Sequence, residues 1–312
     1  MELTSILKKY LTIIVSIFIV FISSWYVKTL KEHTRVTDVH QVQNIGNFSK
    51  QHSCARHPNF LQKLKIPQPI AIDLSQKQHK GLAFLYGKNL SKFVHLKTWK
   101  KFDYFSTYAL DPKGNMYLSP MPFISVNQNT FEFQKNIYKL DTNSGKLSIW
   151  MTLDEVKAGG NNPFGVIALA YDCDDHTLWV SAIDETSYDV SRGVIYHIDI
   201  KLKKILERVD GVDALSLTLV KSDKGKQLLF GGARENTLYT LDTKTLKVTK
   251  LFELSNSDEH IRKIKVRGQN LLELQTIPFS YTLIAETSGG TNRNYYGLKW
   301  DDRNASWSLL LK

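Results

Sequence analysis

Ile137-Tyr-Lys-Leu-Asp141 is repeated along the chain, as Ile195-Tyr-His-Ile-Asp199, as Leu238-Tyr-Thr-Leu-Asp242 and, more loosely, over residues 296–301. Apolar and polar residues alternate in each copy, which is typical of a half-buried β-strand, and each copy ends in an aspartate. Successive copies begin 43 to 58 residues apart. A unit repeated at that period predicts a repeat architecture.

Each copy stands third in a group of four expected strands. Two strands joined by a tight polar turn precede it, and a short apolar strand follows it. In one unit these are residues 107–111, the turn Asp111-Pro-Lys-Gly114, residues 116–119 and, after the copy, residues 146–152. Four short antiparallel strands per unit are typical of a β-propeller blade. The sequence therefore predicts an all-β propeller of four-stranded antiparallel blades over residues 66–312, with five countable blades and a sixth possible; the first unit, from residue 70 to residue 97, is degenerate.

The third unit resembles a known superfamily of propellers. Asn162-Pro-Phe-Gly165 with Thr177-Leu-Trp-Val-Ser181, and Asp210-Gly-Val-Asp213-Ala-Leu-Ser216 at the start of the next unit, are similar to the blade motifs of SMP-30/gluconolactonase-like, strictosidine-synthase-like and NHL-repeat propellers. The resemblance covers residues 66–312. Because many propellers share these motifs, it implies a fold and does not by itself imply a function.

In the gluconolactonase-like branch, a Glu, two Asn and an Asp at the starts of blades bind a divalent cation. The resemblance implies Asn162 and Asp213 as metal ligands for Ca²⁺ or a similar ion, and a metal-dependent lactonase or esterase as one function. The first two units lack the corresponding ligands. Two oxygen ligands are too few for Ca²⁺, which takes six to eight, so we expect a binding protein and keep the hydrolase as the alternative.

Long loops between the second and third strands mark one face of the expected propeller. They cover residues 120–135, 183–192 and 277–293, whereas the hairpins on the opposite face are short. Lengthening on one face alone indicates a working surface for a polar small molecule, a glycan or a protein partner. The candidate ligand-binding residues on these loops and at one blade start are Phe123, Asn127, Asp184, Tyr188, Arg192, Glu259, His260, Phe279 and Tyr281. Two alternatives stay open: the aromatic residues fold inward to plug the channel, and Glu259 with His260 is either a solvated pair or an acid/base pair.

The N-terminal residues 1–27 contain a hydrophobic segment. Residues 10–27 carry no charge, are flanked by lysines, and span about 27 Å as a helix, close to the thickness of a bilayer core. We expect a signal anchor that holds the propeller on the extracytoplasmic side of a membrane; a cleaved signal peptide, giving a secreted protein, is the alternative. Residues 28–65 are polar and are expected to be a connector.

Composition and net charge limit the class of protein and the kinds of partner that we expect. With 42% hydrophobic and 23% charged residues the chain is neither disordered nor a disulfide scaffold, and a mean hydropathy of -0.25 excludes a polytopic membrane protein. The lysines are scattered over hairpins, and part of the net charge of +11 lies in the first unit and the residues before it, so we expect attraction to an anionic membrane surface and no nucleic-acid binding. Cys54 and Cys173 either form a disulfide or are free thiols. No nucleophile-elbow, phosphate-loop, zinc-protease or EF-hand pattern occurs.

Overall fold

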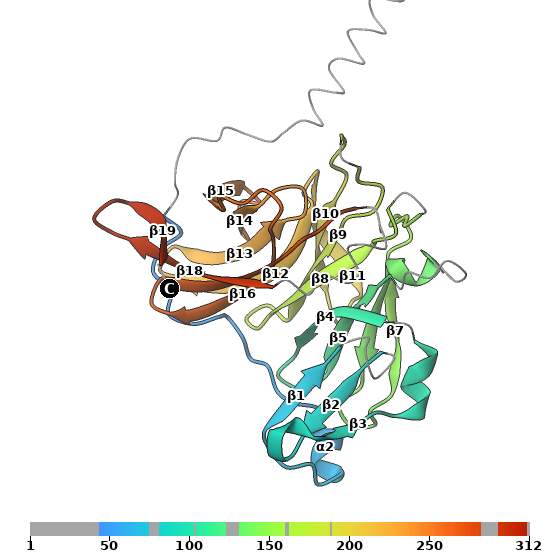
Figure 1. The fold of residues 1–312 in the computed structure, drawn as a ribbon. Coiled ribbons are helices and arrows are strands. Elements are labelled where there is room, and N and C mark those ends of the chain that lie inside the picture. The colour runs from blue at the N-terminus through green and yellow to red at the C-terminus, as the bar shows by residue number, and fades with distance from the viewer. Residues whose placement is uncertain are drawn as a thin grey trace, which may run out of the picture. The chain divides into compact units, whose positions relative to one another are not determined.

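Five antiparallel β-sheets account for most of the described chain (Figure 1). The computed structural model describes residues 44–74, 81–102, 104–122, 131–159, 162–187, 189–281 and 293–310. The expected membrane segment, residues 10–27, lies outside these ranges. No helix within them is long and apolar enough to cross a membrane.

The first two sheets come from the N-terminal half of the described chain. The first has three strands: β1 (Ile70–Asp73), β2 (Ala83–Tyr86) and β3 (Lys92–Val94). Short helices flank it: α2 (Asn59–Lys63), η1 (Lys88–Leu90) and η2 (Lys97–Lys101). The second has four strands, with η3 (Phe131–Lys135) inserted before the third: β4 (Tyr104–Leu110), β5 (Met116–Met121), β6 (Asn136–Leu140) and β7 (Leu147–Thr152).

The remaining three sheets each have four strands in sequence order. The third sheet contains β8 (Val166–Asp172), β9 (Thr177–Ala182), β10 (Val194–Asp199) and β11 (Lys204–Asp210). The fourth contains β12 (Ala214–Ser222), β13 (Gly225–Gly232), β14 (Thr237–Asp242) and β15 (Val248–Glu253). The fifth contains β16 (His260–Gly268), β17 (Leu271–Ile277), β18 (Asn294–Asp301) and β19 (Ser306–Leu310).

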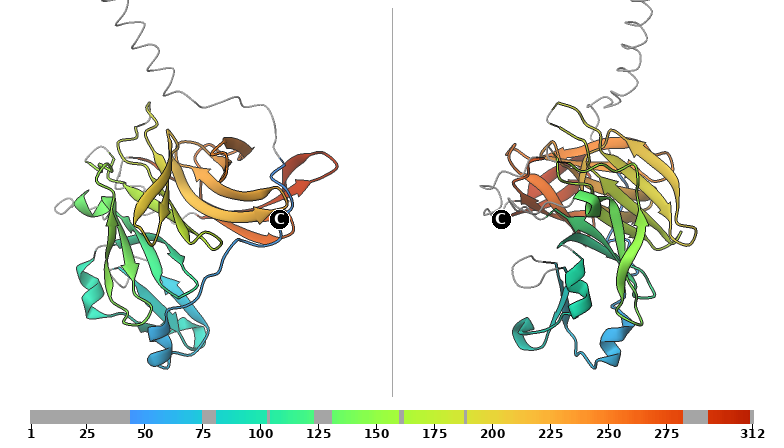
Figure 2. Two further views of the ribbon diagram at one scale, coloured as in Figure 1. Left: turned by 180° about the vertical axis from the view of Figure 1, so that it is seen from behind. Right: turned by 90° about the vertical axis from the view of Figure 1, so that its right-hand side faces the viewer.

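These sheets are the blades of a propeller, as the repeat predicted, although the first blade has three strands among the described residues and not four. The innermost strands of successive blades lie side by side: β4 contacts β8, β8 contacts β12, and β12 contacts β16 (Figures 1 and 2). Each neighbouring pair of blades shares one cluster of buried apolar side chains. The outermost strand of the last blade comes from that blade's own segment of the chain, because β19 pairs with β18.

A small residue on the second strand lets each blade approach the next. Ser119 Oγ donates to the carbonyl oxygen of Ile167 at 3.1 Å, and Ser181 Oγ donates to that of Ala214 at 2.8 Å. At the same place in the fourth blade stands Gly231, where a Cβ would lie 2.1 Å from the carbonyl oxygen of Ile261. The recurring Ser or Gly is therefore required by the packing of blade against blade.

The aspartate that ends each repeated strand caps the following turn. Oδ1 of Asp141 accepts hydrogen bonds from the backbone N–H groups of Asn143 and Ser144, and Oδ1 of Asp242 accepts from those of Lys244 and Thr245. Such Asx turns satisfy backbone donors that the hairpin leaves without strand partners. The repeated motif is thus a strand together with its turn.

A segment ahead of the first blade crosses the hairpin ends of the other four. We call residues 44–58 the strap; it continues into α2, and it is the blue segment that runs from beside β19 to α2 in Figure 1. Asn47 pairs with Asp223 of the fourth blade at 2.8 and 2.9 Å, and the ring of Phe48 stacks on Trp307 of the fifth at 6.2 Å between centroids. The described part of the expected connector therefore packs on the propeller.

The strap also reaches the third and second blades. Cys54 forms a disulfide with Cys173 in the β8–β9 hairpin, with their Cα atoms 5.8 Å apart, which resolves the alternative that the sequence left open. Gly114, in the β4–β5 hairpin, has φ +85°, and a Cβ there would lie 2.7 Å from the carbonyl oxygen of His57. Only glycine suits that position, since the backbone is left-handed and the strap lies against it.

Candidate functional site

The face opposite the strap carries the long loops and the starts of the blades. Of the candidate residues, Asp184, Arg192, Glu259, His260, Phe279 and Tyr281 are described there, together with Asn162 and Asp213. Phe123, Asn127 and Tyr188 lie outside the described residues. We call this surface the loop face.

Several residues of the loop face donate hydrogen bonds to the carboxylate of Asp213. Its Oδ1 accepts hydrogen bonds from Thr186 Oγ1 at 2.7 Å and from the backbone N–H of Gly193 at 2.8 Å. Its Oδ2 accepts from Ser191 Oγ at 2.8 Å and from the Tyr281 hydroxyl at 3.1 Å. The side chain is 2% exposed. Four donors thus fix two segments on one carboxylate: the loop between β9 and β10, and the chain that follows β17 as far as Tyr281.

Thr186 joins the two residues that the sequence proposed as metal ligands. Its hydroxyl donates to Asp213, and its carbonyl oxygen accepts a hydrogen bond from Asn162 Nδ2 at 3.0 Å. The same Nδ2 donates to the carbonyl oxygen of Ile183 at 2.6 Å, and Oδ1 accepts from the backbone N–H of Phe164 at 3.0 Å. Sequence reasoning missed Thr186, because a threonine within a loop carries no motif.

These residues do not fit a calcium site. Every side-chain oxygen of Asp213 and Asn162 already accepts a hydrogen bond from a protein donor. The amide nitrogen of Asn162, which would have to face away from a cation, is held by two carbonyl groups. Ca²⁺ needs several oxygens aimed at one point, whereas these oxygens point into the loop network.

Glu259 is a second saturated carboxylate. Its Oε2 accepts from Thr276 Oγ1 at 2.7 Å, and its Oε1 accepts from the side-chain amides of Asn294 at 2.6 Å and Asn256 at 3.1 Å. Burial would raise the pKa of Glu259, but these bonds and one from Tyr296 outweigh it and hold that pKa below its ordinary value. An ionised, fully bonded carboxylate is a poor general acid or base.

The ring of His260 packs among aromatic side chains. The Phe279 ring lies 6.0 Å from it, 5.1 Å from the Phe164 ring and 5.5 Å from the Tyr281 ring. Tyr281 is buried in the apolar cluster between the third and fourth blades, and the partly buried Phe279 packs against that cluster. Burial lowers the pKa of His260, which keeps its ring neutral at neutral pH.

Asp184 and Arg192 lie on the loop between β9 and β10. Asp184 is buried and accepts a hydrogen bond from the backbone N–H of Lys157 at 2.9 Å. Burial raises its pKa above the ordinary value. Arg192 is exposed and pairs with Glu185 at 3.3 Å, an ion pair that is open to solvent and therefore weak. This pair is therefore one part of the loop that is available to a partner.

A charged side chain, that of Arg262, enters the channel. Arg262, at the start of β16, donates from Nη1 to the carbonyl oxygen of Leu215 at 3.0 Å, and from Nη2 to the carbonyl oxygen of Ser106 at 3.2 Å. Nη2 also bonds to the Ser106 hydroxyl. The corresponding positions of the third and fourth blades hold Ile167 and Leu215, so an alignment of the repeats would have singled out the arginine.

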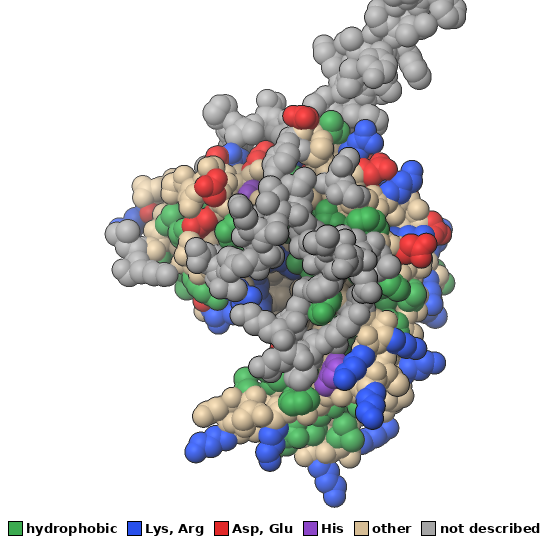
Figure 3. Space-filling view, turned by 45° about the vertical axis from the view of Figure 1, so that its right-hand side comes forward, with side chains coloured by type: hydrophobic (Ala, Val, Ile, Leu, Met, Phe, Trp, Pro, Cys, Tyr) green, Lys and Arg blue, Asp and Glu red, His purple; other side chains and the backbone are tan. Residues whose placement is uncertain are grey.

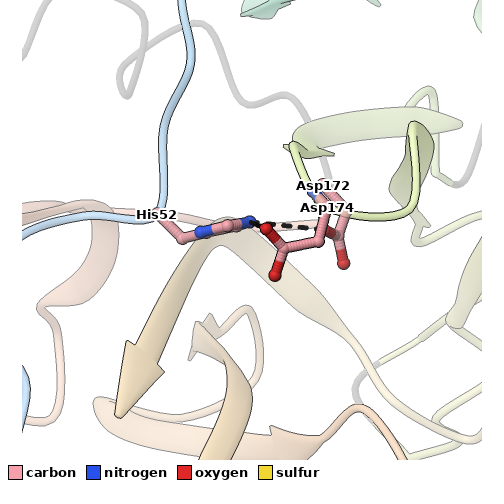
Figure 4. A group of neighbouring side chains, drawn as sticks. All are labelled: His52, Asp172 and Asp174. Carbon is pink, nitrogen blue, oxygen red and sulfur yellow. Dashed lines mark hydrogen bonds and ion pairs between the residues drawn. The ribbon is translucent and has the colours of Figure 1, made fainter.

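The strap face holds a separate cluster of charged residues (Figure 4). His52 Nε2 lies 3.3 Å from Asp172 Oδ1 and 3.7 Å from Asp174 Oδ1. The Lys226 ammonium lies 2.6 Å from Asp172 Oδ2 and also bonds to Asp175. Lys221 also bonds to Asp174 Oδ2 at 2.9 Å, so each carboxylate of the cluster is paired with a basic side chain, and we interpret the cluster as a structural ion network.

Comparison with known proteins finds similar chains among solved structures and none by sequence. No protein-family model matches the sequence, and no curated protein matches it. Among solved structures, the chain is similar to Kuenenia stuttgartiensis hydrazine synthase, with 11% identity over 75% of this chain and 78% of that one and a TM-score of 0.43. It is also similar to the dihydro-heme d1 dehydrogenase NirN, with 13% identity over 79% of this chain and a TM-score of 0.41. The chain spans about half the length of NirN, 47%.

Proposed function

We propose that this protein is a membrane-tethered binding propeller that holds a polar ligand or a protein partner on its loop face. The observation that carries the proposal is the network around Asp213, which holds the long β9–β10 loop by three hydrogen bonds and the chain after β17 by a fourth. A preformed surface loses little conformational entropy on binding. The strap face has tight hairpins and is already covered by residues 44–58.

The chemistry of the loop face favours binding over hydrolysis. A gluconolactonase-like enzyme needs open oxygen ligands for its metal ion, and both candidate ligands are bonded within the protein. The Glu259 carboxylate is bonded on both oxygens, and the neighbouring His260 is held neutral by burial. The hydrolase remains one outcome of the test below.

An extracytoplasmic location is supported by the disulfide between Cys54 and Cys173. Disulfides persist in oxidising compartments and are rare in the cytosol of most cells. Together with the uncharged residues 10–27, this favours a signal anchor with the propeller outside, or secretion if the segment is cleaved.

Charge is concentrated in one part of the chain. Residues 44–102 contain eleven Lys and Arg residues and a single acidic residue, Asp73. On the face that Figure 3 shows, the lower part of the molecule, where β1 to β3 lie in Figure 1, carries blue side chains, whereas the upper part carries both blue and red ones. A surface with this excess is attracted to anionic lipid headgroups, which would hold the first blade near the membrane.

The test uses the full chain in non-ionic detergent. A glycan array, a peptide library and a metabolite panel are screened, with a lactone and ester panel beside them. The loop-face variant Glu185→Ala/Arg192→Ala removes an exposed ion pair, and Arg267→Ala/Glu273→Ala removes a matched exposed pair at the opposite end of the fifth blade. We expect a ligand lost by the first variant and kept by the second. Metal-dependent turnover of a lactone would overturn the proposal in favour of the hydrolase.

A further inference from the structure

A β-bulge directs Arg262 into the channel. The register of β16 with β17 shifts between Ile261 and Lys263, so the arginine between them is the extra residue of the bulge. The innermost strands β8 and β12 carry bulges at the same place, between Val166 and Ala168 and between Ala214 and Ser216. Bulges re-aim side chains. The residues at the corresponding bulges, Ile167 and Leu215, are apolar.

The guanidinium of Arg262 touches two other blades. Its partners are Leu215 on β12 of the fourth blade and Ser106 on β4 of the second. Arg262 belongs to the fifth blade, and its guanidinium bonds to both of these blades, so the group lies among the innermost strands. It lies close to the loop face, because Arg262 is near the start of β16, which begins at His260. Arg262 as a whole residue is partly exposed.

No carboxylate in the described ranges forms an ion pair or hydrogen bond with Arg262. Its three hydrogen bonds to described residues go to neutral oxygens, and a guanidinium has five N–H groups, so two are left for another acceptor. Burial, and then the positive charge of Arg293, lower its pKa to about 10, which still leaves the group charged at neutral pH. A charge in such surroundings is normally paired.

We propose that the channel binds an oxyanion, a carboxylate or phosphate group of the ligand, on the guanidinium of Arg262. The two remaining N–H groups and the low polarity of the site suit a charge-assisted hydrogen bond to such a group. Arg293, which directly precedes β18, adds positive potential. This inference deepens the proposed function, on which it rests, by naming the ligand's anionic group. The competing role of Arg262 is a purely structural strut between blades.

The experiment measures thermal unfolding of the full chain in non-ionic detergent with inorganic phosphate or acetate as the probe. Sodium chloride at matched ionic strength is the blank. We expect a saturable rise in Tm of about 2 to 4 °C or more with at least one oxyanion, because a ligand that binds only the native state stabilises it. Arg262→Met should abolish this rise. Arg267→Met, on the same strand but paired with Glu273, should keep it.

A second variant covers the case in which Arg262→Met does not fold. Arg262→Lys keeps the positive charge but loses the planar guanidinium, which can donate two parallel hydrogen bonds to one oxyanion. It should therefore weaken oxyanion binding at least about tenfold. Hydrogen exchange of the unmodified protein should show added protection in β4, β12 and β16 with the oxyanion present. An equal Tm rise in folded Arg262→Met, or no saturable rise in the unmodified protein, overturns the inference.

The two proposals fail separately. A ligand found on the loop face, lost by Glu185→Ala/Arg192→Ala and bound equally by Arg262→Met, leaves the proposed function intact and removes the channel site. In the opposite case, Arg262 binds an oxyanion, but the ligands found in the screen bind Glu185→Ala/Arg192→Ala as well as the unmodified protein. That result supports the channel site and removes the loop-face function.

Discussion

Cys54 of the strap is bonded to Cys173 of the third blade, across 119 residues of sequence. Closing so long a loop restricts the unfolded chain strongly, and loss of such a disulfide typically costs about 2 to 5 kcal/mol. We expect the Cys54→Ser/Cys173→Ser variant to lose that amount of unfolding free energy. Chemical denaturation followed by tryptophan fluorescence measures it.

Reductant supplies the control for the disulfide. Dithiothreitol should destabilise the unmodified protein and leave the double variant unchanged, because the variant has no bond to reduce. Equal stability of the unmodified protein with and without reductant would show that the strap is held by its other contacts alone.

Gly231 faces the carbonyl oxygen of Ile261 in the next blade. A Cβ added at Gly231 would lie 2.1 Å from that oxygen, so the fourth and fifth blades must separate to admit it. We expect Gly231→Ala to cost about 3 kcal/mol, as overpacked cores do. Gly159→Ala is the matched control, because no described atom lies within 4 Å of the position its Cβ would take, and it should change the stability little. Similar thermal shifts for both variants would contradict this account of blade packing.

The repeat in the sequence predicted the blades closely, because each strand, its turn and its capping aspartate lie within a few residues of one another. β7, for example, covers Leu147–Thr152, where a strand over residues 146–152 was expected. The strap was not predicted, since residues 44–58 bind through contacts more than a hundred residues distant, such as Asn47 with Asp223. The sequence also did not predict that both oxygens of Asp213 accept hydrogen bonds, because the donors come from two loops without motifs.

Asp213 offers a direct test of the loop network. Replacing it with asparagine removes the charge and turns one acceptor atom into a donor, so two of the four hydrogen bonds to this side chain are lost. We expect a loss of about 2 to 3 kcal/mol and faster proteolysis within residues 183–193. Asp210→Asn, at an exposed site nearby, is the control. Calorimetry of the unmodified protein should show no calcium binding that Asp213→Asn removes; such binding would restore the metal hypothesis.

The turn aspartates predict a loss of stability in acid. At Asp242, burial would raise the pKa, but hydrogen bonds from Thr245, Gln227 and Lys244 outweigh it and hold the pKa below its ordinary value of 3.8. A lowered pKa in the folded state contributes stability above 3.8 that is lost as the pH falls through the folded value. Asp242→Asn keeps the acceptor for the turn without the charge. Its stability, measured by denaturation between about pH 5 and pH 2, should fall less steeply than that of the unmodified protein; parallel curves would refute this.

Lys226 and Lys221 each form an ion pair with an aspartate of the β8–β9 hairpin, and the two ion pairs differ in burial. Lys226 and Asp172 are 18% and 2% exposed, whereas Lys221 and Asp174 are 60% and 39% exposed. Removing the ammonium of Lys226 leaves the buried carboxylate of Asp172 without its lysine partner, and breaking such a buried pair costs about 3 kcal/mol. Removing Lys221 exposes Asp174 to water, which costs about 0.5 kcal/mol or less.

Lys226→Met and Lys221→Met therefore form a matched pair that tests whether the cluster is structural. We expect a large fall in Tm for the first variant and almost none for the second. If instead Zn²⁺ or Mn²⁺ stabilises the unmodified protein and fails to stabilise a His52→Ala variant, the network is a metal site, and the lysine only its resting counter-ion.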